Sequence, residues 1–212
     1  MAKGGRGGRR GGGFKAPSNY SNGLGNKMPE TLDEALGKQG NPMSEANAWF
    51  DANPYYSDNY SEFSENCQRC VFAYEMRRRG YDVVAQPTYR GDEMPRGGNW
   101  QNAMSGMTSV NVGRTTERAT INNIEKQMSN WGEGSRGIVR VKWAGGNSGH
   151  VFNVEYSNGK LKVYDVQSNK RTTGKNYLKE IMPYTTLSRT ELFRTDNATP
   201  TDTMKQMVMQ KN

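Results

Sequence analysis

The chain carries three side chains suited to nucleophilic catalysis: two cysteines, Cys67 and Cys70, and a single histidine, His150. Both cysteines lie at the start of residues 65–79, where apolar residues recur with helical spacing. The unpaired N–H groups and positive dipole end of a first helical turn favour a thiolate over a thiol. Because the chain has one histidine, any cysteine–histidine pair has one possible base. We therefore expect Cys67 to be the nucleophile and His150 the general base and acid.

A hairpin places a carboxylate beside this histidine. Asn158-Gly159 separates two stretches of alternating apolar residues, 150–156 and 160–167, and is a strong two-residue turn signal. Antiparallel pairing across that turn puts Gln167 opposite His150 and Asp165 on the diagonal, about 7–8 Å away between Cα atoms. The sequence thus predicts that Asp165 orients the histidine ring, with Gln167 as a second orienting candidate.

Three further features of the site stay open at this level. Asn66, Gln68 and the backbone N–H of Cys67 are candidate donors to an oxyanion. Cys70, three residues after Cys67, also fits a redox pair, although a buried small residue on the inner helix face is the favoured interpretation. No second Cys or Cys/His pair completes a zinc site, so we expect no metal and no cofactor.

The surrounding pattern indicates an α+β domain in which the cysteine-bearing helix packs on an antiparallel sheet. Residues 116–130 have helical spacing, residues 88–113 suggest a long loop, and residues 175–193 fit a helix or a strand. We predict four regions: a disordered Gly/Arg-rich arm (1–27), short helices and an aromatic wrap (28–63), the catalytic domain (64–195) and a flexible C-terminal tail (196–212). A small docking helix is the alternative for this last segment, because its methionines have near-helical spacing.

The charge is unevenly distributed. The net charge is +8, and residues 1–15 contribute five basic and no acidic residues, which leaves the rest of the chain at +3. We therefore expect any nucleic-acid contact to be weak and to involve this arm rather than the folded domain. No apolar run reaches the roughly 18 residues of a membrane span, and no apolar segment follows the basic start, so we expect neither a membrane partner nor a secretory signal.

Four sequence motifs resemble those of a known protein family. They are Asn66-Cys67-Gln68-Arg69-Cys70, Arg79-Gly80-Tyr81-Asp82-Val83, Gly149-His150-Val151-Phe152-Asn153-Val154 and Tyr164-Asp165-Val166-Gln167. In this order they resemble the papain-fold toxin domains described as glutamine deamidases, found at the ends of bacterial polymorphic toxins and in phage head-associated proteins. The resemblance covers about residues 60–170 and implies a papain-like fold with Cys67, His150 and Asp165 as catalytic residues. The glutamine that helps form the oxyanion hole in papain has no counterpart in residues 53–63.

By this resemblance the protein is expected to deamidate protein glutamine side chains through a thioester on Cys67, as a toxin or effector. The implied partners are a protein substrate and a phage head or toxin-delivery partner, and the implied location is the cytoplasm of a bacterial host, with virion association as an alternative. Other interpretations remain: a papain-like cysteine peptidase, a packaged phage or mobile-element protein that binds nucleic acid through its arm, and a thiol oxidoreductase using Cys67 and Cys70.

Overall fold

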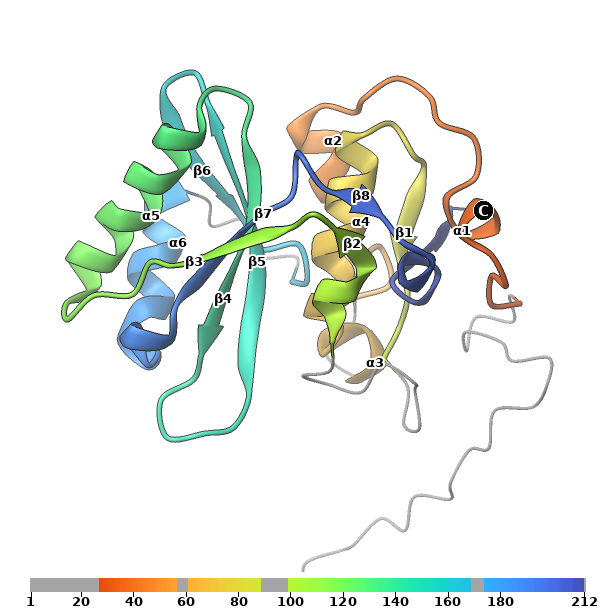
Figure 1. The fold of residues 1–212 in the computed structure, drawn as a ribbon. Helices are drawn as coiled ribbons and strands as arrows, with labels where there is room; N and C mark the ends of the chain where they lie inside the picture. Colours follow the sequence, from red (N-terminus) through yellow and green to blue (C-terminus); the bar gives the residue numbers. More distant parts are fainter. Residues whose placement is uncertain (1–26, 57–60, 89–98, 169–173, 212) are drawn as a thin grey trace, which may run out of the picture.

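The computed structural model describes residues 27–56, 61–88, 99–168 and 174–211. A five-stranded antiparallel sheet stands between two groups of helices (Figure 1). Nearly all of the predicted arm, residues 1–27, lies outside the described residues, as does part of the predicted loop 88–113. The helices and strands support the predicted α+β class.

The elements follow in chain order. The helices are α1 (Leu32–Leu36), α2 (Glu45–Phe50), α3 (Ser61–Ser64), α4 (Cys67–Arg78), α5 (Glu117–Trp131) and α6 (Gly174–Ile181), with short 3-10 helices η1 (Trp100–Ala103), η2 (Met182–Tyr184), η3 (Leu187–Arg189) and η4 (Asp202–Gln206). The strands are β1 (Val83–Ala85), β2 (Met104–Ser105), β3 (Thr108–Asn111), β4 (Arg136–Lys142), β5 (Gly149–Ser157), β6 (Lys160–Tyr164), β7 (Glu191–Arg194), β8 (Thr199–Pro200) and β9 (Val208–Gln210).

Local sequence explains where several helices begin. Thr31, Ser44 and Thr116 each lie just before a helix and have an extended backbone. The side chain of each accepts a hydrogen bond from the backbone N–H three residues later, which satisfies one free N–H of the first turn. The predicted helices before residue 51 and at 116–130 are thereby confirmed. Of the aromatic residues in the predicted wrap, Phe63 is buried whereas Phe50 is 52% exposed.

The main sheet has the strand order β3-β7-β4-β5-β6. The β5–β6 ladder runs from Ser157 opposite Lys160 to Asn153 opposite Tyr164, which confirms the predicted hairpin register. Asn158 and Gly159 both have positive φ, as a tight hairpin turn with the twist of the strands requires.

The predicted pairing of His150 with Gln167 is not made, because β6 ends at Tyr164. Beyond that point the backbone carbonyls bond to other segments instead of β5. The indole N–H of Trp49 donates to the carbonyl of Asp165 at 3.0 Å, and the side-chain amide of Asn53 donates to that of Gln167 at 2.8 Å. Within the described residues, the start of β5, which carries His150, is therefore paired by main chain only with β4.

Both faces of the sheet are covered. Helices α5 and α6 lie on one side, and α4 lies on the other together with α1 and α2 (Figure 1). Alternate β5 residues divide between the two cores, with Phe152 and Val154 on the α5–α6 side and Val151 on the α4 side. Because α4 packs directly on β5, the start of this helix is brought to the end of the sheet that carries His150.

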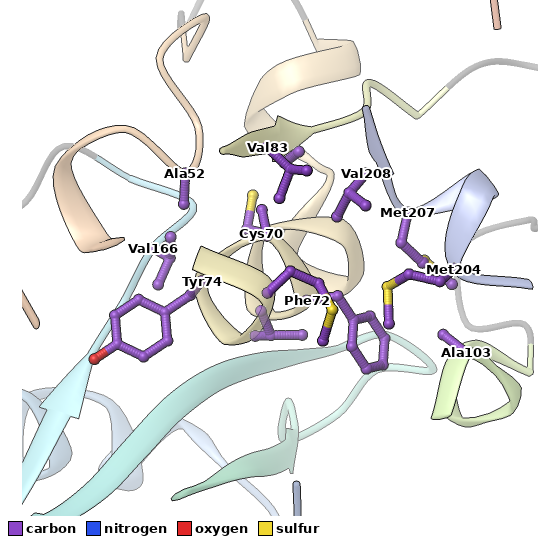
Figure 2. Close-up of a cluster of buried hydrophobic side chains, with 14 of the residues drawn as sticks. Ala52, Cys70, Phe72, Tyr74, Val83, Ala103, Val166, Met204, Met207 and Val208 are labelled. Atoms are coloured by element: carbon purple, nitrogen blue, oxygen red, sulfur yellow. The ribbon is translucent and has the colours of Figure 1, made fainter. Parts of the chain in front are cut away.

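The C-terminal segment differs from the flexible tail that we expected. Strand β9 pairs with β1, and Met204, Met207 and Val208 are buried against the α4 core (Figure 2). The long loop also contains structure where it is described, because β3 pairs with β7 at the edge of the main sheet and β2 pairs with β8.

Candidate active site

Cys67 is the first residue of α4 and its side chain is partly exposed. The carbonyl of Asn66, just before it, accepts the N–H groups of Arg69 and Cys70 at 2.8 and 3.1 Å, but no side chain caps the helix. Within the described ranges, the N–H groups of Cys67 and Gln68 have no acceptor. The sulfur thus lies beside two free backbone donors at the positive end of a helix dipole.

His150, the second residue of β5, is buried between Cys67 and Asp165. Its Nε2 lies 3.3 Å from Oδ2 of Asp165, and the side chain of Cys67 is close enough to interact with the ring and raise its pKa. The ring of Trp143 stacks on it, with centroids 6.1 Å apart and planes 11° from parallel. These contacts hold the imidazole in one plane between the thiol and the carboxylate.

Charge dominates the protonation of this histidine. Burial acts to lower the pKa of His150, but the carboxylate of Asp165 and the hydrogen bond with Cys67 outweigh it and raise the pKa to about 10. The ring therefore carries both protons at neutral pH. For Asp165, burial acts to raise the pKa, and the charge and hydrogen bond of His150 lower it below its usual value.

Asp165 is held by donors that the sequence does not reveal. The buried hydroxyl of Tyr177, on α6, donates to its Oδ2 at 2.8 Å, and the backbone N–H of Gln167 donates to its Oδ1 at 3.2 Å. The ring of Tyr177 packs edge-on against Phe152. Tyr177 and Trp143 thus belong to the site although neither was predicted, because an apolar aromatic in a helix or strand pattern gives no sign of a catalytic neighbour.

Asn66 does not have the role of oxyanion donor for which it was a candidate. It is buried, and its side-chain NH₂ donates to Oδ1 of Asn53 at 3.2 Å and to the carbonyl of Gln86 at 3.1 Å. Since both hydrogens are used, this amide has none left for an oxyanion. It forms instead, with Asn53, a bridge from the start of α4 to the backbone of Gln167.

The two glutamines of the predicted set lie near the site without a defined role. Gln68 follows Cys67 in the first turn of α4, and its partly exposed side chain makes no hydrogen bond within the described ranges. The backbone of Gln167 bonds to Asp165 and Asn53, while its side chain makes no hydrogen bond to His150. As candidates for holding an oxyanion or the histidine, both stay predictions.

Cys70 is buried one turn further along α4, among the apolar side chains of the α4 core (Figure 2). Its thiol donates to Oδ1 of Asn66 at 3.1 Å. Burial is the main cause that raises the pKa of Cys70 well above its usual value, and the nearby Cys67 and Asp165 raise it further. Cys70 therefore stays a protonated, packed thiol, whereas Cys67 faces the histidine.

Two other classes of site were sought in the described part of the chain. No group of three or more His, Cys, Asp or Glu side chains there is arranged to hold a metal ion. None of the helices in these ranges has the length and apolar character that crossing a membrane requires.

Comparison with known proteins gives one family. Residues 65–170, half of the chain, match the family described as papain fold toxin 1, glutamine deamidase. Comparison with curated proteins found no match, and comparison with solved structures found none either. The matched span begins two residues before Cys67 and contains His150 and Asp165. The chain belongs to the papain fold toxin 1 family of glutamine deamidases.

Proposed function

We propose that this protein hydrolyses the carboxamide of glutamine side chains in other proteins, with Cys67 as nucleophile, His150 as acid and base, and Asp165 as the group that orients the histidine. The observation that carries the proposal is the placement of His150, whose Nε2 lies 3.3 Å from the carboxylate of Asp165 and whose ring interacts with the side chain of Cys67. A protonated ring in this position donates to both partners and stabilises a thiolate.

The chemistry follows from these positions. The sulfur of Cys67 adds to the carboxamide carbon, and the oxygen that becomes negative is stabilised by the free N–H groups of Cys67 and Gln68. His150 gives its proton to the departing nitrogen, which leaves as ammonia, and a thioester remains. His150 then takes a proton from water, whose hydroxide attacks the thioester. The products are a glutamate side chain and the regenerated cysteine.

The test is ammonia release from glutamine-containing peptides and proteins, with mass spectrometry to locate the glutamate formed. We expect Cys67→Ala to lower the rate by at least about 10³-fold, because no thiolate remains to form the thioester. Cys70→Ser is the matched control and keeps most of the activity, since Cys70 is buried and its thiol donates to Asn66. Retained activity in Cys67→Ala with loss in Cys70→Ser would assign the nucleophile to the other cysteine.

The same assay separates deamidation from the peptidase alternative. A peptidase would cut the chain of the substrate at a backbone carbonyl, whereas a deamidase leaves the chain length unchanged. The family description favours deamidation. Binding of nucleic acid through residues 1–15 stays a prediction, because these residues lie outside the described ranges. Association with a phage head and delivery as a toxin stay predictions as well.

A further inference from the structure

An open pocket lies beside the turn between β4 and β5. Its volume is about 440 Å³ and its lining is polar and basic, formed by Lys142, Gly145, Gly146, Asn147, Thr186 and Arg189. Gly145 and Gly146 have open space or only distant atoms where a side chain would project, so the turn leaves the opening unfilled. The pocket contains none of the residues of the proposed catalytic group.

The lining presents hydrogen-bond donors without acceptors. Within the described residues, neither Lys142 nor Arg189 forms an ion pair, and the backbone N–H groups of Gly145, Gly146 and Asn147 bond to no carbonyl. The closest carboxylate along β7, that of Glu191, is already paired with Arg140. Two cations and a glycine turn with free N–H groups are a combination that binds carboxylate or phosphate oxygens.

The pocket and the catalytic histidine share the same two strands. Lys142 pairs with Gly149 and Val141 pairs with His150, so Lys142 lies one residue along the ladder from the histidine. Trp143, the next residue, stacks on the His150 ring, and its bridge to Thr185 adjoins Thr186 of the pocket lining. A protein segment that presents a glutamine to Cys67 can therefore extend past His150 towards this pocket.

We propose that the pocket is a substrate subsite that binds an acidic side chain a few residues from the target glutamine. The substrates are then proteins whose reactive glutamine is flanked by aspartate or glutamate. This inference depends on the proposed function for its biological role. An acidic side chain is favoured over free phosphate because the family's description as a glutamine deamidase implies a protein substrate and because Lys142 of the pocket lies one ladder position from His150.

The test compares peptides of equal length that carry one glutamine with acidic, neutral or basic neighbours. For the full chain we expect the KM for the acidic peptide to be about tenfold lower than that for the neutral one, and the difference to shrink as salt is added. Arg189→Glu and Lys142→Glu should remove this preference. Lys160→Glu, the same charge change at the exposed first residue of β6, which pairs with the opposite end of β5, should preserve it.

Binding keeps the test independent of turnover. Fluorescence anisotropy with Cys67→Ala measures the affinity of each labelled peptide, and adding Arg189→Glu should weaken the acidic peptide about tenfold and the neutral one much less. Equal affinities for the acidic and neutral peptides would overturn the subsite. So would inorganic phosphate that competes while Arg189→Glu leaves peptide binding unchanged, since the pocket would then hold a free anion only. Acidic preference in binding without ammonia release would overturn the proposed reaction and leave the subsite standing.

Discussion

The two ends of helix α4 are built in opposite ways. At its C-terminal end, the buried carboxylate of Glu75 accepts from Arg79 at 2.7 Å, from Arg136 at 2.9 Å and from Thr195 at 3.1 Å. At its N-terminal end, no side chain caps the first turn, and the N–H groups of Cys67 and Gln68 have no acceptor in the described part of the chain. The charged side chains at one end form ion pairs, and the other end leaves two backbone donors available.

This difference separates stability from chemistry along one helix. Paired guanidinium groups and carboxylates fix α4 against the sheet, because each buried charge needs its partner. Arg78 adds to this by donating to Glu155 of β5 at 2.7 Å. With the helix held at its far end, its first turn keeps a thiol and free donors in place opposite His150. A reactive site tolerates unpaired donors only where the rest of the element is fixed.

The largest effect is expected from breaking the paired end. Glu75→Gln removes the charge that two guanidinium groups share, and we expect the free energy of unfolding to fall by about 3–5 kcal/mol in urea titrations. The matched control is Glu125→Gln. Glu125 pairs with Lys175 at 2.6 Å, but both side chains are partly exposed, so the expected loss is below about 1 kcal/mol. Equal losses in the two variants would contradict a stabilising role of the buried network.

A second change alters the reactive end without touching the paired one. Asp165→Asn removes the negative charge that raises the pKa of His150 to about 10, so we expect that pKa to fall. The imidazolium needed to protonate the departing amide nitrogen is then lost at lower pH, and the alkaline limb of kcat/KM moves down by more than about one pH unit, with a loss of about 10²-fold at pH 9. Asp196→Asn, which breaks a pair with Arg194 away from the site, should leave the limb unchanged.

The protonation of His150 also makes the stability of the fold depend on pH. Because the pKa of His150 is raised from 6.5 to about 10 in the folded protein, its bonds contribute fully below pH 6.5 and are lost as pH rises towards 10. The wild-type protein should therefore lose more of its free energy of unfolding between pH 7 and 10 than Asp165→Asn does. If the free energy of unfolding depended on pH in the same way in the two proteins, the carboxylate of Asp165 would not be the group that raises the pKa of His150.

Local sequence signals predicted the parts of the site that depend on local rules. The Asn158-Gly159 turn fixed the β5–β6 register, and helix periodicity placed Cys67 at a helix start. The predicted pairing of His150 with Gln167 failed because the backbone carbonyls after β6 accept hydrogen bonds from Trp49 and Asn53, more than 100 residues earlier, and not from β5. No pattern within the hairpin records such a contact.

Long-range pairing also explains the error at the C-terminus. Residues 196–212 are mostly polar, which favoured a flexible tail, and the near-helical spacing of their methionines left a small docking helix as the alternative. The segment is ordered because β9 adds to β1 and buries Met204 and Met207 against α4. Each short strand is weak by itself, and burial becomes possible only after the rest of the domain has folded.

The smallest expected effect tests whether Tyr177 of α6 sets the pKa of Asp165 at the reactive end of α4. Tyr177→Phe keeps the ring against Phe152 and removes one hydroxyl that donates to Asp165. The pKa of Asp165 should rise, so the acid limb of kcat/KM moves to higher pH, and the rate at neutral pH should fall by at most about tenfold.

Tyr74→Phe is the matched control, because its buried hydroxyl donates to Glu155 at the same 2.8 Å but lies away from the site. Both variants should lose about 1–2 kcal/mol of stability, and only Tyr177→Phe should shift the pH profile. An unshifted profile would reduce Tyr177 to a packing residue.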